Sequence, residues 1–128
     1  MKYTYNKLVR DKIPANIDSM EGRKANWRVM ENEEYIKELN KKLLEEAHEF
    51  IEENAVEELA DIMEVIQSIM RAKNISYEEL KKVQELKREQ KGGFYNKVYL
   101  IDVEQDKVDE REEKEMKKDW RKNSLDER

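Results

Sequence analysis

Two pairs of carboxylates in the middle of the sequence have the types and spacing of ligands for a divalent metal ion. Glu46 and Glu49 form an ExxE pair, and Glu58 and Asp61 form an ExxD pair. Residues three apart on a helix project from nearly the same face, so each pair can point two carboxylates in one direction. Mg²⁺ and Mn²⁺ are hard cations that take carboxylate oxygens as ligands. The pattern therefore predicts a metal site wherever two helices bring the pairs together.

A helical hairpin is the element that would position these carboxylates. In residues 33–53 apolar side chains recur every three or four positions, which predicts an amphipathic helix. Asn54 and Glu57 have the form of a capping box, so a second helix is expected to begin there and to end near Lys73. The connection between the two helices is therefore very short.

The short connection decides which carboxylates face one another. If the chain folds back between residues 53 and 54, Glu49 comes level with Glu58, and Glu46 comes level with Asp61. A helical wheel also places Glu58 inside the apolar arc of its helix. A carboxylate in such an arc needs a cation or hydrogen-bond donors, because burying an unpaired charge is very unfavourable.

The alternative is that these carboxylates are surface charges or structural ion pairs. Asp, Glu, Lys and Arg make up 45% of the chain, so an ExxE pattern also arises by chance on a solvated helix. The matched heights of the two pairs and the apolar surroundings of Glu58 favour the metal site.

Composition limits the class of protein. The chain of 128 residues is expected to form one domain with a thin core, since 38% of its residues are hydrophobic, and oligomerisation would enlarge that core. It contains no cysteine and no apolar run of membrane-spanning length, so we expect a cytoplasmic protein without disulfides or a membrane partner. The net charge of -5 disfavours long nucleic acid as a partner, because such binding depends on clustered Lys and Arg. A small nucleotide remains compatible.

Other segments flank the hairpin. Residues 1–26 are expected to form an irregular arm. Ser76 and Glu79 form a capping box that predicts a third helix, which Gly92 and Gly93 end. The two glycines either only stop this helix or also let backbone N–H groups approach a phosphate.

The end of the chain has a different character. Residues 94–103 are rich in β-branched and aromatic side chains, which predicts an extended segment, and residues 3–5 are the available partner for a small two-stranded ribbon. Residues 102–128 are nearly all charged and are expected to form a solvated helix. This extension, which follows a domain of residues 1–101, is either a dispensable tail or a clasp onto a neighbouring subunit.

Four stretches of the sequence carry a resemblance to a known family. They are YNKLVRDKIP at residues 5–14, KLLEE at 42–46, EELADIMEVI at 57–66 and KREQKGGF at 87–94. In these stretches the chain resembles the all-α nucleoside triphosphate pyrophosphatases, and in particular the small MazG-like proteins labelled phosphoribosyl-ATP pyrophosphohydrolase-like. The resemblance implies a mainly all-α, antiparallel helical bundle that packs as a dimer or tetramer. It also implies Mg²⁺-dependent cleavage of a nucleoside triphosphate between its α and β phosphates.

The resemblance gives individual residues their expected roles. Glu46, Glu49, Glu58 and Asp61 would hold Mg²⁺, with Mn²⁺ as a substitute, and activate the attacking water. Glu45 is either a helping base or a residue that points to solvent. Basic side chains near both ends of the domain could bind the phosphates that the metal does not reach. These are Lys7, Arg10, Lys12, Lys87, Arg88 and Lys91. His48 is expected to be exposed and without a catalytic role.

Three functions stay open at this point. The favoured function is a house-cleaning hydrolase of the nucleotide pool. The second is phosphoribosyl-ATP pyrophosphohydrolase in histidine biosynthesis. The third is a non-catalytic helical protein, either a nucleotide sensor or an oligomeric scaffold whose carboxylates bind structural metal or pair with lysines.

Overall fold

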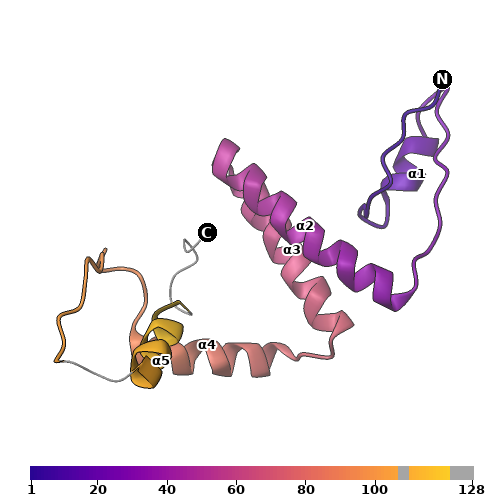
Figure 1. The fold of residues 1–128 in the computed structure, drawn as a ribbon. Coiled ribbons are helices and arrows are strands. Elements are labelled where there is room, and N and C mark those ends of the chain that lie inside the picture. The colour runs from indigo at the N-terminus through magenta and orange to yellow at the C-terminus, as the bar shows by residue number, and fades with distance from the viewer. Residues whose placement is uncertain (107–109, 122–128) are drawn as a thin grey trace. The chain divides into compact units, whose positions relative to one another are not determined.

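The computed structural model describes residues 1–106 and 110–121, with the side chains of residues 1–106 and 110–118. In these ranges it contains helices and no strand, which confirms the all-α prediction. The helices are α1 (Ile13–Asp18), α2 (Asn32–Glu53), α3 (Val56–Ala72), α4 (Tyr77–Lys91) and α5 (Glu110–Arg121) (Figure 1). The chain divides into two compact units, Met1–Gly92 and Gly93–Arg128. None of the described helices has the length and apolarity needed to cross a membrane.

The predicted hairpin is formed by α2 and α3, which run antiparallel along each other (Figure 1). Its turn differs from the prediction. Asn54 does not cap the start of α3; it ends α2 in the left-handed conformation, with φ of 53°, and its N–H donates to the carbonyl of Phe50 at 2.8 Å. Asparagine tolerates this conformation better than most residues, which suits it to a helix C-cap. Ala55 precedes α3 and offers no side-chain cap, so the capping-box prediction is wrong here.

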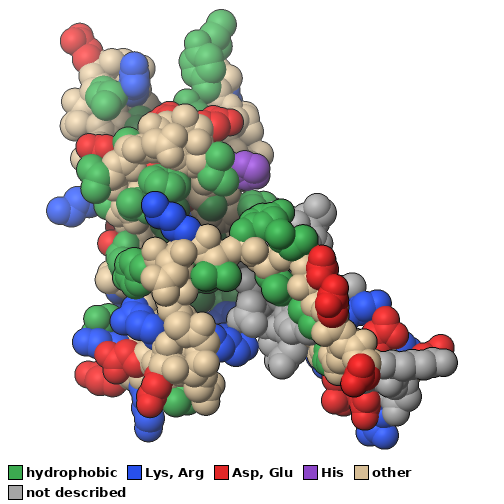
Figure 2. Space-filling view, turned by 90° about the vertical axis from the view of Figure 1, so that its left-hand side faces the viewer, with side chains coloured by type: hydrophobic (Ala, Val, Ile, Leu, Met, Phe, Trp, Pro, Cys, Tyr) green, Lys and Arg blue, Asp and Glu red, His purple; other side chains and the backbone are tan. Residues whose placement is uncertain are grey.

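The core of the hairpin is small, as the composition predicts. The buried hydrophobic residues in the described structure are Leu39, Val65 and Met70. Further hydrophobic residues of the hairpin are about half exposed or more, namely Leu44, Ile51, Val56, Leu59 and Met63. Figure 2 shows hydrophobic side chains at the surface among the charged ones. Packing within one chain therefore leaves much apolar area in contact with water.

The arm before α2 is not wholly irregular, because it contains the short helix α1. Pro14 lies in the first turn, where its fixed φ suits a helix start and its missing N–H has no helical partner to lose. Leu8, Val9 and Ile13 are half-buried. The structure joins the arm to the hairpin by ion pairs from Lys7 to Glu45 and from Arg10 to Asp61.

The third predicted helix is confirmed as α4. The Ser76 hydroxyl accepts a hydrogen bond from the N–H of Glu79 at 3.1 Å, and Gly92, with φ of 83°, follows the last turn. Every residue of α4 is exposed.

The predicted two-stranded ribbon is absent from the described residues, since neither residues 3–5 nor residues 94–103 form a strand. All side chains of residues 94–106 are exposed, so no buried face holds that segment in a sheet. Helix α5 confirms a helix within the charged extension. Residues 107–109 and 122–128 of that extension lie outside the described residues.

Candidate metal site

Three carboxylates of α2 lie close together near the middle of the hairpin. Glu45, Glu46 and Glu49 each offer one oxygen, and these oxygens lie within 4.8 Å of one another. The helical period brings Glu45 and Glu49 one turn apart, with Glu46 on the side that faces α3. Glu46 is buried, and Glu45 is half-buried. Two of the four predicted ligands, Glu46 and Glu49, are therefore neighbours in the structure.

Glu46 carries an unsatisfied oxygen. Its residue is 6% exposed, and its Oε2 has no hydrogen-bond partner among the described residues. The other oxygen, Oε1, lies 3.6 Å from Lys42 Nζ. Burial raises the pKa of Glu46, and the negative charges of Glu49 and Asp61 raise it further. A buried carboxylate oxygen among other carboxylates is the environment that a cation relieves.

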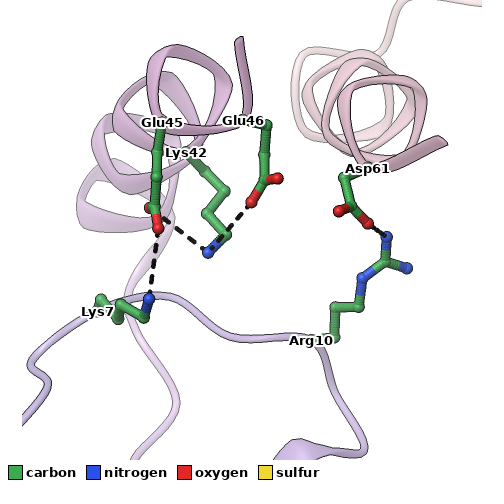
Figure 3. Close-up of polar contacts among 6 residues, drawn as sticks. All are labelled: Lys7, Arg10, Lys42, Glu45, Glu46 and Asp61. Carbon is green, nitrogen blue, oxygen red and sulfur yellow. Dashed lines mark hydrogen bonds and ion pairs between the residues drawn. The ribbon is translucent and has the colours of Figure 1, made fainter. Parts of the chain in front are cut away.

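Asp61 approaches this group from α3. Its charge acts on Glu46, and Figure 3 shows the two side chains projecting toward the space between the helices. Arg10 of the arm donates from Nη2 to Asp61 Oδ1 at 2.6 Å. Asp61 is the residue that the folded-back register places level with Glu46, and it lies outside the group of three close carboxylates, as Glu58 does.

Glu58 is buried at 8% exposure, as its place in the apolar arc predicts, and Glu53 is the acidic side chain with which it shares a hydrogen bond. A hydrogen bond with Glu53, burial, and the charges of Glu53 and Asp61 raise the pKa of Glu58 to about 7. Glu58 lies in the first turn of α3, and Glu53 is the last residue of α2. The group of three close carboxylates does not include Glu58.

Glu45, which the sequence leaves undecided, belongs to the acidic group. Its Oε1 lies 3.3 Å from Lys7 Nζ and its Oε2 lies 3.5 Å from Lys42 Nζ (Figure 3). Partial burial alone would raise the pKa of Glu45, but the charges of Lys42 and Lys7 lower it overall. Lys42 is a site residue that the sequence analysis missed. Its spacing of four residues from Glu46, a favourable ion-pair spacing on a helix, is the signal that could have found it.

The arm supplies the basic groups nearest the carboxylates. Of the basic residues predicted to bind phosphate, Lys7 and Arg10 form ion pairs with the described carboxylates of the hairpin. The others lie elsewhere: Lys12 precedes α1, and the last two turns of α4 carry Lys87, Arg88 and Lys91. His48 is exposed, as predicted.

The donor set fits a hard divalent cation. Its close group consists of three carboxylates of α2, without sulfur or imidazole, and one of their oxygens is buried and unpaired within the described structure; the charge of Asp61 on α3 also acts on Glu46. Mg²⁺ and Mn²⁺ bind to one or a few carboxylates and keep positions for water and phosphate oxygens. Lys42, Lys7 and Arg10 at the edge of the group are the natural partners of an anionic ligand.

Comparisons of the chain with protein-family models, with curated proteins and with solved structures found no match.

Proposed function

We propose that the protein is a Mg²⁺-dependent nucleoside triphosphate pyrophosphohydrolase of the MazG-like type. It cleaves between the α and β phosphates and releases a nucleoside monophosphate and pyrophosphate, as a house-cleaning enzyme of the cytoplasm. The observation that carries this proposal is the buried, unpaired Oε2 of Glu46 among the carboxylates of Glu45, Glu49 and Asp61. The sequence resemblance to the all-α nucleoside triphosphate pyrophosphatases supplies the reaction.

Glu46, Glu49 and Asp61 would hold the metal, with Glu45 beside them. When bound, Mg²⁺ supplies charge neutralisation and acidifies a water molecule. Glu58, with a pKa of about 7, can take up a proton at neutral pH, which suits a general base for the attacking water. The water oxygen forms a bond to one phosphorus of the α–β anhydride. The bridging oxygen leaves with the other phosphorus, and the water proton passes to the base.

We also propose that the chain works as a homodimer or homotetramer of the MazG-type bundle. The small core and the exposed hydrophobic residues of α2 and α3 support this proposal. A second hairpin packed on these residues would add the apolar burial that one chain lacks. Analytical ultracentrifugation measures the mass directly, and a monomer at all concentrations would contradict the oligomer.

A non-catalytic oligomeric scaffold is the second candidate. The observation in its favour is that the described carboxylates Glu45 and Asp61 already have cationic partners in Lys7, Lys42 and Arg10, as structural ion pairs would. Such pairs leave Glu46 Oε2 unexplained, which is why the metal-dependent enzyme is preferred.

The product of the reaction tests the proposal. Purified protein is incubated with Mg²⁺ or Mn²⁺ and with a panel of canonical and modified nucleoside triphosphates plus phosphoribosyl-ATP, and the products are separated. Nucleoside monophosphate with pyrophosphate would support the enzyme, and the preferred compound would identify the substrate. Turnover of phosphoribosyl-ATP alone would favour histidine biosynthesis. No turnover of any compound would contradict the proposed function and favour a sensor or scaffold.

A further inference from the structure

The N-terminal arm brings two cations to the carboxylates from far away in the sequence. Arg10 Nη2 lies 2.6 Å from Asp61 Oδ1, and Lys7 Nζ lies 3.3 Å from Glu45 Oε1. These partners are 51 and 38 residues apart, so the contacts are tertiary and not the local pairs common on charged helices. Figure 3 shows both side chains reaching from one stretch of the arm toward the two helices.

The charges in this group are not balanced. Four carboxylates face three cations: those of Glu45, Glu46, Glu49 and Asp61 against those of Lys7, Arg10 and Lys42. One negative charge is left over, and Glu46 Oε2 is buried without a partner. Binding of a divalent ion would change the net charge of this group from one negative to one positive. The ion and all three side-chain cations therefore compete for the same oxygens.

The arm cations are the ones that can leave. The side chains of Arg10 and Lys7 are 56% and 44% exposed, whereas that of Lys42 is 19% exposed and belongs to α2 itself. Ion pairs between exposed groups are weak, so breaking them costs little. Leu8 and Val9, which lie between the two cations in the sequence, are half-buried.

We propose that Arg10 and Lys7 are exchangeable counter-ions of the metal site, which release Asp61 and Glu45 when a divalent ion binds and then bind the polyphosphate chain of the substrate. This proposal rests on the proposed function, because it takes the carboxylates as metal ligands. A guanidinium can form two parallel hydrogen bonds to a phosphate group, so Arg10 is the stronger of the two phosphate ligands. The exchange makes these arm residues positioning groups for the phosphates, and it favours substrates with a chain of phosphates over monophosphates.

The first half of the test measures metal binding without any nucleotide. Mn²⁺ is titrated calorimetrically into the full chain of the wild type, Arg10→Gln and Arg10→Lys, with Arg23→Gln as the control. Arg23 is an exposed arginine of the same arm whose described side-chain bond is to the Met20 sulfur. Because Arg10→Gln removes a competitor from Asp61, we expect Mn²⁺ to bind it about two- to fivefold more tightly than it binds the wild type. Arg10→Lys and Arg23→Gln should resemble the wild type.

The second half measures phosphate binding with inorganic triphosphate at saturating Mn²⁺. Arg10→Gln should now bind about tenfold more weakly than the wild type, and Arg10→Lys should recover part of the loss. A residue with only a structural role would not change the two affinities in opposite directions. Unchanged or weaker Mn²⁺ binding in Arg10→Gln, or unchanged triphosphate binding, would overturn the exchange of counter-ions but would not contradict the proposed enzymatic function. A wild type that binds no Mn²⁺ would overturn both the exchange and the proposed function.

Discussion

Replacing Glu46 with glutamine is expected to stabilise the protein in the absence of metal. The Glu46 side chain is 8% exposed, and its Oε2 is unpaired within the described structure. A buried polar group without a partner costs about 1–3 kcal/mol, and more when it is charged. The neutral amide of glutamine removes the charge that Glu49 and Asp61 disfavour, and it adds an N–H donor among carboxylates.

The gain has to be weighed against one lost contact. The variant loses the ion pair between Glu46 and Lys42, which is 3.6 Å long and has the spacing of a helical i,i+4 pair. Such pairs contribute about 0.3–0.5 kcal/mol. A net increase of about 1 kcal/mol in the free energy of unfolding follows, equivalent to a rise of about 4 °C in Tm for a unit of this size.

Thermal unfolding followed by circular dichroism, with EDTA and then with Mg²⁺, measures both consequences. With Mg²⁺ at about ten times its Kd, the free energy of unfolding should rise by about 1.4 kcal/mol for the wild type and hardly at all for Glu46→Gln. The matched control is Glu33→Gln, on the same helix, where the side chain is 89% exposed. The free energy of unfolding of Glu33→Gln should stay within about 0.5 kcal/mol of the wild-type value in both buffers. Destabilisation of Glu46→Gln in EDTA, or equal Mg²⁺ stabilisation of both proteins, would refute the reasoning.

The remaining predictions concern turnover, pH and the charged extension. Asp61→Asn should lower Mg²⁺-dependent turnover at least about 100-fold with unchanged helix content, since a metal ligand is lost; circular dichroism and product separation check both, and full activity would remove the metal assignment. The metal-free protein should lose stability as the pH rises from about 4.5 to about 7. Glu46 and Glu58 have raised folded-state pKa values, to about 7 for Glu58, so the folded chain holds protons in this range that the unfolded chain has released. Urea unfolding at pH 5, 6 and 7.5 measures this, and a free energy that is constant or rises with pH would contradict it. Truncation after Val103 should leave kcat and KM unchanged and alter at most the oligomer mass, so a folded but inactive truncation would show that the extension takes part.

The hairpin and the burial of its acids could be predicted from sequence because both depend on local periodicity. The apolar repeat of α2 and α3 fixes their facing sides, and the same wheel places Glu58 among apolar neighbours. The details of the turn could not be predicted, because Asn54 fits both a helix start and a left-handed helix end.

The contacts of the arm with the hairpin could not be predicted from the periodicity of apolar residues. Arg10 and Asp61 are 51 residues apart in the sequence, and no sequence pattern around either residue indicates that the two are paired. The sequence does not decide the role of Glu45 for a related reason. Its position is off the apolar stripe, but its carboxylate pairs with Lys7 and Lys42 and belongs to the acidic group. The predicted ribbon failed because β-propensity reflects packing on a sheet, and residues 94–103 have no buried face to pack.

Direct observation of metal binding tests the central claim most simply. Mn²⁺ added to the full chain in increments is followed by the electron paramagnetic resonance signal of the free ion, for the wild type, Glu46→Gln and the control Glu33→Gln. If the carboxylates around Glu46 form a metal site, the wild type and Glu33→Gln will bind Mn²⁺ in a saturable way that Mg²⁺ reverses, and Glu46→Gln will bind it at least about tenfold more weakly. Equal Mn²⁺ binding by all three proteins, or none by the wild type, would contradict the assignment of this site.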